Sequence, residues 1–155
     1  MEKNVVANSL REDIRAAIAR DPRRATSEAV RLLKAGVPQY TWVGIYLLEG
    51  EELVLGPFLG KPSPHTRIPL GRGICGAAAT QKATIIVDDV NADPRYLACS
   101  LETQSEIVVP IMDGDQVLGE IDIDSDRRAA FDESDRQLLE AVAALLVPVL
   151  QTVRK

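Results

Sequence analysis

The dipeptide Asp113-Gly114 constrains the fold more than any other feature of this 155-residue chain. Asp-Gly is a strong signal for a two-residue hairpin turn, and here it lies between two runs of strand-forming residues, 105–112 and 116–124. Strands joined by so short a turn pair antiparallel. Residues 41–58 hold a second pair of strand-like runs around a glycine-containing turn. The sheet is therefore expected to be antiparallel and assembled from hairpins.

Helical periodicity lies outside these hairpins. Residues 5–20 repeat apolar side chains at spacings of three and four, and a second helix is expected to start at Asp21-Pro22 and to end at Gly36. A last helix follows Asp132 and carries a broad apolar stripe. Pro148 lies inside that stripe and is expected to kink or interrupt the helix.

Two short strands, 67–70 and 84–87, bring the expected number to about six, and a glycine turn at residues 71–73 should lead into a short helix. Runs of helix outside a sheet of hairpins predict an α+β fold. No strand–helix–strand alternation is present, and no G-x-G-x-x-G follows a strand, so a dinucleotide-binding fold is disfavoured. The expected organisation is a single domain, 1–155, with N-terminal helices over 5–36, sheet and pocket over 40–125, and the C-terminal helix over 132–153.

Composition and charge exclude several classes of partner. The net charge is −5 and the basic residues are scattered, which argues against nucleic acid. The longest apolar run, 141–150, is too short to cross a bilayer, and nothing at the N-terminus resembles a signal peptide. The protein is expected to be cytoplasmic, without a membrane partner. A permanent disulfide between its two cysteines is not expected in that compartment.

Acidic residues gather on the predicted strand 116–124. Strict alternation would give one face Leu118, Glu120, Asp122 and Asp124, and the other face Val117, Gly119, Ile121 and Ile123. Such an acidic face is usually exposed to solvent. The neighbouring strand 105–112 is apolar on both faces except at Glu106, which suggests a covered region where a carboxylate needs a partner or a raised pKa.

Aromatic residues are scarce, at 4% of the chain, and two of them share one face of the first strand. Trp42 and Tyr46 flank Gly44, which is expected to leave a gap between the rings. Core packing is the ordinary role for such residues. Beside carboxylates, however, they would also suit a small cationic or amphipathic ligand such as an amino acid.

The two cysteines differ in context. Cys75 lies among small apolar residues, as a buried structural thiol would. Cys99 lies in a loop after a proline turn, which is a more usual place for function. Two cysteines and one histidine show no metal-ligand spacing, so no metal site is expected. His65 is expected to be a solvated loop residue, and nothing supports a Cys–His hydrolase.

A set of motifs now points to one family. They run in the family's order over residues 40–140: Tyr-Thr-Trp-Val-Gly-Ile-Tyr, Leu-Gly-Pro-Phe-x-Gly-Lys-Pro, Arg-Ile-Pro-x-Gly-Arg-Gly-x-Cys-Gly, Ala-Cys, Ser-Glu-Ile-Val-x-Pro and Asp-Ile-Asp-Ser. This pattern closely resembles the free methionine-R-sulfoxide reductases, which are single GAF-domain proteins. The resemblance implies a GAF-like antiparallel sheet with the N-terminal helical hairpin and the C-terminal helix on one face.

The resemblance also implies the site and its chemistry. Cys99 matches the catalytic cysteine, and Cys75 matches a second cysteine that can form a disulfide with it. Trp42 and Tyr46 match aromatic walls around the methyl sulfoxide. Glu106, Asp122 and Asp124 match the pocket carboxylates, with Glu106 also the expected proton donor. The implied substrate is free methionine sulfoxide, and the implied reductant is thioredoxin rather than a bound cofactor. A homodimer is implied as well.

One departure from the family pattern concerns the resolving thiol. The family usually has a further cysteine just after Gly-Lys-Pro, and His65 lies at about that position here. Resolution of an oxidised Cys99 would then fall to Cys75 or to an external thiol. Two other readings stay open, namely a non-catalytic GAF module that binds a small metabolite, and a redox sensor based on the two cysteines.

Overall fold

The computed structural model describes residues 2–97 and 102–153, and it shows six antiparallel strands in one sheet. The strand order is β3-β2-β1-β6-β5-β4, so the two long strands of the Asp113-Gly114 hairpin lie near the centre. The strands are β1 (Trp42–Glu49), β2 (Glu52–Leu59), β3 (Arg67–Pro69), β4 (Ile85–Val87), β5 (Ser105–Asp113) and β6 (Gln116–Ser125).

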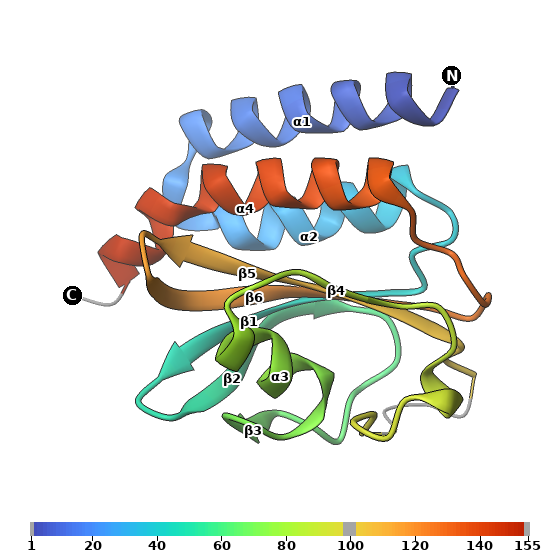
Figure 1. Ribbon diagram of the computed structural model, residues 1–155. Helices are drawn as coiled ribbons and strands as arrows, with labels where there is room; N and C mark the ends of the chain where they lie inside the picture. Colours follow the sequence, from blue (N-terminus) through green and yellow to red (C-terminus); the bar gives the residue numbers. More distant parts are fainter. Residues whose placement is uncertain (1, 98–101, 154–155) are drawn as a thin grey trace.

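Helices α2 (Ala25–Gly36) and α4 (Glu133–Val153) cover one face of this sheet, α1 (Glu2–Arg20) lies over these two helices, and one short helix covers the other face (Figure 1). Helices α1, α2 and α4 pack together on the first side of the sheet. Helix α3 (Gly73–Gln81) lies on the opposite face, against β5 and β6. This arrangement confirms the expected α+β fold, with the N-terminal helices and the long C-terminal helix on one face.

The capping residues found in the sequence fix where these helices begin. Asp21 accepts a hydrogen bond from the Arg23 backbone N–H at the start of a short 3-10 turn, Pro22–Arg24, that leads into α2. At the start of α4, Asp132 accepts from the Ser134 N–H, and the Asp132 N–H donates back to Asp135 at 2.8 Å. Asp135 also accepts from the Tyr40 hydroxyl at 2.5 Å, which ties α4 to the entry of β1.

Helix α4 runs through Pro148 to Val153, so the break considered at this proline does not occur. Buried apolar residues lie on both sides of Pro148, at Leu146 and Leu150. Their burial against the sheet offsets the one backbone hydrogen bond that proline removes.

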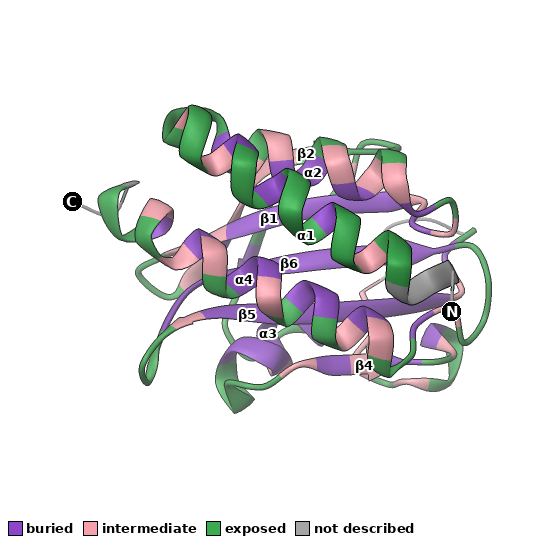
Figure 2. Cartoon of the chain, turned by 90° about the horizontal axis from the view of Figure 1, so that it is seen from above, coloured by how far each residue is buried: buried purple, intermediate pink, exposed green. Residues whose placement is uncertain are grey.

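Most residues of β1, β5 and β6 are buried (Figure 2), and the two faces of the sheet bury different side chains. The helical face holds the larger apolar core, which includes Ile121 and Ile123 of β6 together with side chains of α1, α2 and α4. The second core lies under α3 and includes Trp42, Tyr46 and Cys75. Among the described helices, none is both long enough and apolar enough to cross a membrane.

Strict alternation along β6 assigned its first residues to the wrong faces. A β-bulge between Ile111 and Met112 pairs Ile111 with Gly119 and Met112 with Val117, so Leu118 is the extra residue. As a result, Leu118 joins the helical core and Val117 joins the core under α3, opposite to the sequence prediction. The assignment of Glu120, Asp122 and Asp124 to one face is unaffected.

Replacing Gly119 by alanine should destabilise the protein by about 1–3 kcal/mol, because an added Cβ would lie 2.3 Å from the backbone oxygen of Tyr46. Urea unfolding followed by circular dichroism measures this difference. Gly114→Asn is the control, since that hairpin glycine has φ of +60° and no neighbour within 4 Å, and asparagine tolerates this conformation. Equal midpoints for Gly119→Ala and the wild type would contradict the close approach of β1 and β6.

Candidate active site

Four carboxyl groups lie in a compact group on the face of the sheet under α3. Glu120, Asp122 and Asp124 alternate along β6, and the β5–β6 register places Glu106 directly opposite Asp124. None of the four side chains is more than 4% exposed. The usual interpretation of an acidic strand face, exposure to solvent, is therefore wrong here.

Helix α3 covers these acids because its residues are small. Gly71 and Gly73 both have positive φ and turn the chain from β3 into the helix. A Cβ at Gly76 would lie 2.9 Å from the Gly71 backbone nitrogen, so this turn requires glycine. The resulting close packing brings Cys75 down onto β5 and β6 and leaves it 4% exposed.

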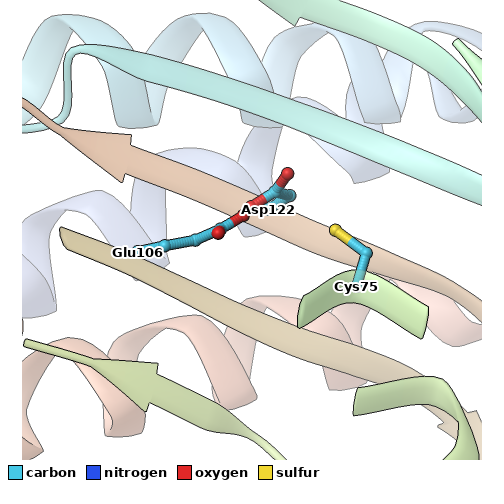
Figure 3. Close-up of side chains that lie close together, drawn as sticks. All are labelled: Cys75, Glu106 and Asp122. Carbon is cyan, nitrogen blue, oxygen red and sulfur yellow. The ribbon is translucent and has the colours of Figure 1, made fainter. Parts of the chain in front are cut away.

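Cys75, Glu106 and Asp122 converge on one point, although they come from α3, β5 and β6 (Figure 3). The Cys75 sulfur and one oxygen from each carboxyl group all lie within 4.8 Å of one another. These three side chains are close enough to hold a metal ion. Sequence spacing could not reveal this group, because sheet pairing and helix packing assemble it from distant segments.

The electrostatics of this group follow from burial. Burial is the main cause that raises the pKa of Glu120, Asp122 and Asp124 above their ordinary values, and the negative charge of Asp122 adds to the shift for Glu120 and Asp124. In the described part of the chain, no neighbouring cation opposes these shifts. The pKa of the Cys75 thiol is also raised, first by burial and then by Asp122, Glu120 and Glu106.

Several oxygens of these acids lack hydrogen-bond partners among the described residues. They are both oxygens of Glu120 and one each of Asp122 and Asp124. Glu106 lies within hydrogen-bonding reach of Asp122 and Asp124. A carboxylate has no donor of its own, so a hydrogen bond between two carboxyl groups requires a proton on one of them. The contact therefore favours the protonated form of one of these acids.

Glu120 was absent from the site residues predicted from sequence. Alternation had placed it on the acidic face, but the family resemblance named only the other three acids. Glu120 is completely buried. The Cys75 thiol lies close enough to lower the pKa of Glu120 and so to oppose part of the rise that burial causes. The thiol and the Glu120 carboxyl group do not, however, form a hydrogen bond of ordinary geometry. The available signal was its alternation with Asp122 and Asp124.

Both predicted aromatic residues lie on the same face as the acids. The β1–β6 register pairs Trp42 with Asp124 and Tyr46 with Glu120. The Trp42 indole N–H donates to the Lys61 carbonyl at 2.9 Å, and the Tyr46 hydroxyl donates to the His65 carbonyl at 2.8 Å. These bonds tie the loop after β2 to the two aromatic side chains, and His65 is half-buried in that loop.

The gap expected at Gly44 is filled by Trp42 itself. A Cβ at Gly44 would lie 2.3 Å from the outer edge of the Trp42 ring, which stacks on its other neighbour, Phe58, with ring centroids 5.7 Å apart. Gly44 is therefore needed so that the indole can lie flat across β1. The prediction of open space between the two rings was wrong.

A cavity of about 400 Å³ opens beside these residues. Trp42 and Asp124 line it, and so do Lys61 and Glu102, whose side chains form an ion pair. The complete lining is Thr41, Trp42, Lys61, Ser63, Glu102, Thr103, Asp124 and Asp126. The lining does not include the other predicted site residues that the structure describes, which are Tyr46, Cys75, Glu106 and Asp122. These residues are buried under α3.

Cys99, the predicted catalytic cysteine, lies outside the described residues. The described chain on one side of it ends at Leu97, whose side chain packs against Gly73 at the start of α3. On the other side the described chain resumes at Glu102, which lines the cavity. Both neighbouring segments thus lie at the site.

Replacing Glu120 by glutamine should make stability less dependent on pH. The folded protein keeps the Glu120 proton at pH values where the unfolded chain, with a pKa near 4.5, has released it. The free energy of unfolding therefore falls as pH rises above about 4.5, until the raised pKa is passed. Thermal unfolding between about pH 5 and 9 should show a Tm gain for Glu120→Gln that grows with pH. Glu51→Gln, in an exposed turn, is the control, and a gain that is constant or shrinks would contradict burial of an unpaired acid.

Comparison with known proteins places this chain in a family. A GAF domain model matches residues 21–148. The free methionine-R-sulfoxide reductase of Escherichia coli is 40% identical over 121 residues, which cover 78% of this chain and 73% of that protein. The GAF domain-containing protein A of Dictyostelium discoideum is 46% identical over 108 residues, covering 69% and 68% of the two chains.

A solved structure extends the similarity to almost the whole chain. The free methionine-R-sulfoxide reductase of Neisseria meningitidis, in complex with its substrate, superposes with a TM-score of 0.92 at 35% identity and covers 99% of this chain and 93% of that one. The fold described above is thus the GAF fold. The chain belongs to the GAF-domain family that contains the free methionine-R-sulfoxide reductases.

Proposed function

We propose that the protein reduces free L-methionine-(R)-S-oxide to methionine with a thiol as reductant. The observation that carries this proposal is the buried group of Cys75 and four carboxyl groups, which lies next to a cavity lined by Trp42 and Asp124. Relatives with this activity in their names are about 40% identical, which supports the same reaction. Free methionine sulfoxide is small enough for a cavity of about 400 Å³.

Substrate binding would use the aromatic side chains and the carboxyl groups of this site. Trp42 and Tyr46 would surround the methyl sulfoxide end, since both rings lie on the acidic face of the sheet. Asp122 and Asp124 would hold the α-ammonium group, because buried carboxyl groups without a cation gain most from a positively charged ligand. A methionine sulfoxide inside a peptide has no such ammonium group, which would explain selectivity for the free amino acid.

The first chemical step would be attack of the Cys99 thiolate on the sulfoxide sulfur. Glu106 would give a proton to the leaving oxygen, since it lies within hydrogen-bonding reach of Asp122 and Asp124, whose pKa values are raised. Sulfur in the substrate is reduced, Cys99 is oxidised to a sulfenic acid, and methionine leaves. Oxygen is thereby transferred from substrate to enzyme.

Cys75 would then resolve the sulfenic acid. Its thiol condenses with Cys99–SOH to form the Cys75–Cys99 disulfide and water, and a thioredoxin-type dithiol restores both thiols. Burial raises the pKa of the Cys75 thiol, so it stays protonated and unreactive before Cys99 is oxidised. The usual family cysteine near position 65 is replaced by His65, which leaves Cys75 as the internal thiol available. Cytoplasmic location, a homodimer and repair of oxidised free methionine belong to the same proposal.

The two cysteines should have separable effects on turnover. Cys99→Ser should abolish reduction of free methionine-(R)-sulfoxide with either thioredoxin or dithiothreitol, because the nucleophile is lost. Cys75→Ser should lose turnover with thioredoxin and keep it with dithiothreitol, which can reduce the sulfenic acid directly. Coupled NADPH oxidation and chromatography of the methionine product measure the two cases. No turnover by folded, reduced wild-type protein with either reductant would overturn the proposed activity.

Replacing Glu106 by glutamine should lower kcat/KM with dithiothreitol by about 10²–10⁴-fold, because glutamine keeps the shape of the side chain and cannot donate the proton. Initial rates of methionine formation measure this effect. Glu133→Gln changes an exposed acid at the start of α4 and should leave the rate unchanged. A Glu106→Gln rate within about twofold of the wild type would remove Glu106 from the role of proton donor.

A non-catalytic GAF module that binds a small metabolite is the second candidate. The specific observation in its favour is that the relative from Dictyostelium is named only for its GAF domain. A redox sensor based on Cys75 and Cys99 is a further possibility. Wild-type protein that binds free methionine sulfoxide without reducing it would support the binding module, and Cys99→Ser would then keep the wild-type affinity.

A further inference from the structure

The buried cluster of Cys75, Glu106 and Asp122 has the donor set of a metal site. Its sulfur and two carboxyl oxygens lie within 4.8 Å of one another, from three separate elements of the fold (Figure 3). Zinc binds sulfur at about 2.3 Å and carboxyl oxygen at about 2.0–2.2 Å. Modest rotation of side chains would bring the three donors to these distances around one cation.

Glu120 supplies an independent observation at the same place. Its side chain has no exposed surface, and neither of its oxygens has a hydrogen-bond partner among the described residues. The charge of Glu120 raises the pKa of the Cys75 thiol, and the charge of Asp122 raises the pKa of Glu120. The Glu120 carboxyl group therefore faces the cluster. An unpaired carboxyl group at this depth requires an explanation. It is placed to serve as the fourth ligand of a closed site.

The donors indicate the class of cation. One thiolate with carboxylates suits a borderline-soft ion such as Zn²⁺, whereas Mg²⁺ and Ca²⁺ prefer oxygen ligands alone. Binding would break the Cys75 S–H bond and the O–H bonds of those ligating carboxyl groups that are protonated. These protons would pass to solvent as sulfur–metal and oxygen–metal bonds form, with no change in oxidation state. The cation would also neutralise the charge of Glu120 and Asp122. Among the described residues, no positively charged side chain shifts the pKa of either acid.

We propose that Cys75, Glu106, Asp122 and Glu120 form a site for a thiolate-binding divalent cation of the Zn²⁺ class. If the chain is the reductase proposed above, a cation there would hold Cys75 and occupy Glu106 and Asp122. Zinc would then act as a reversible inhibitor that competes with the sulfoxide substrate. The binding of the metal itself does not depend on that function.

The test is titration of reduced, metal-free protein with Zn²⁺ against a chromophoric chelator, together with Co²⁺ as a spectroscopic probe. The wild type should bind one ion per chain, and Co²⁺ should give a thiolate charge-transfer band in the near ultraviolet. Cys75→Ser should abolish that band, and Cys75→Ser and Asp122→Asn should each weaken Zn²⁺ binding at least about tenfold. Circular dichroism confirms that each variant is folded.

Two control variants keep the result specific. Cys99→Ser and Asp115→Asn, the second in the exposed hairpin turn, should keep both the band and the affinity. Loss of the band in Cys99→Ser but not in Cys75→Ser would overturn the proposed site, as would unchanged affinity in both cluster variants. Inactive wild-type protein that still binds Zn²⁺ through Cys75 would refute the reductase and leave the metal site standing.

Discussion

The cost of burying carboxyl groups is the constraint on which the rest of this structure depends. A charged carboxylate in an apolar interior is so unfavourable that it takes up a proton or finds a positive partner. All four acids of the site are buried: Glu106, Glu120, Asp122 and Asp124. No cation is among the described neighbours that shift the pKa values of the last three. The fold therefore favours the protonated forms of Glu120, Asp122 and Asp124, next to a thiol whose pKa is raised as well.

The sheet can hold these acids because its other face is largely apolar. Along β6, Ile121 and Ile123 alternate with the acids and enter the core under α1, α2 and α4. Burial of apolar surface on that face stabilises the strand pair by roughly 25 cal/mol per Å². This gain offsets the free-energy cost of burying carboxyl groups on the face beneath α3. The helical layer thus supports the site without contacting it. Small residues in α3 complete the arrangement, because only they let the helix approach β5 and β6 so closely.

Local signals in the sequence were enough to predict the hairpins, the helix starts and the acidic face of β6. Asp113-Gly114 fixed the central strand pair, and Asp21 and Asp132 marked helix starts that the structure confirms. An error arose where one residue altered a regular pattern, as the bulge at Leu118 did. At Pro148 the helix continues, because distant packing of its apolar side chains outweighs the local effect of proline. The convergence of Cys75 with Glu106 and Asp122 lay beyond sequence reasoning, because it depends on how α3 docks. Glu120 is different, since alternation alone had already placed it with the other acids.

Binding of the free amino acid at the acidic face is the central claim, and Trp42 offers a direct measurement of it. Trp42 is the single tryptophan of the chain and lines the cavity, so its fluorescence reports on this site. Free methionine-(R)-sulfoxide and its N-acetyl derivative would be titrated into the Cys99→Ser protein, in which no turnover interferes. A saturable change with the free amino acid and none with the N-acetyl form is the predicted result. Equal responses to both compounds, or no response to either, would contradict recognition of the ammonium group by the buried carboxyl groups.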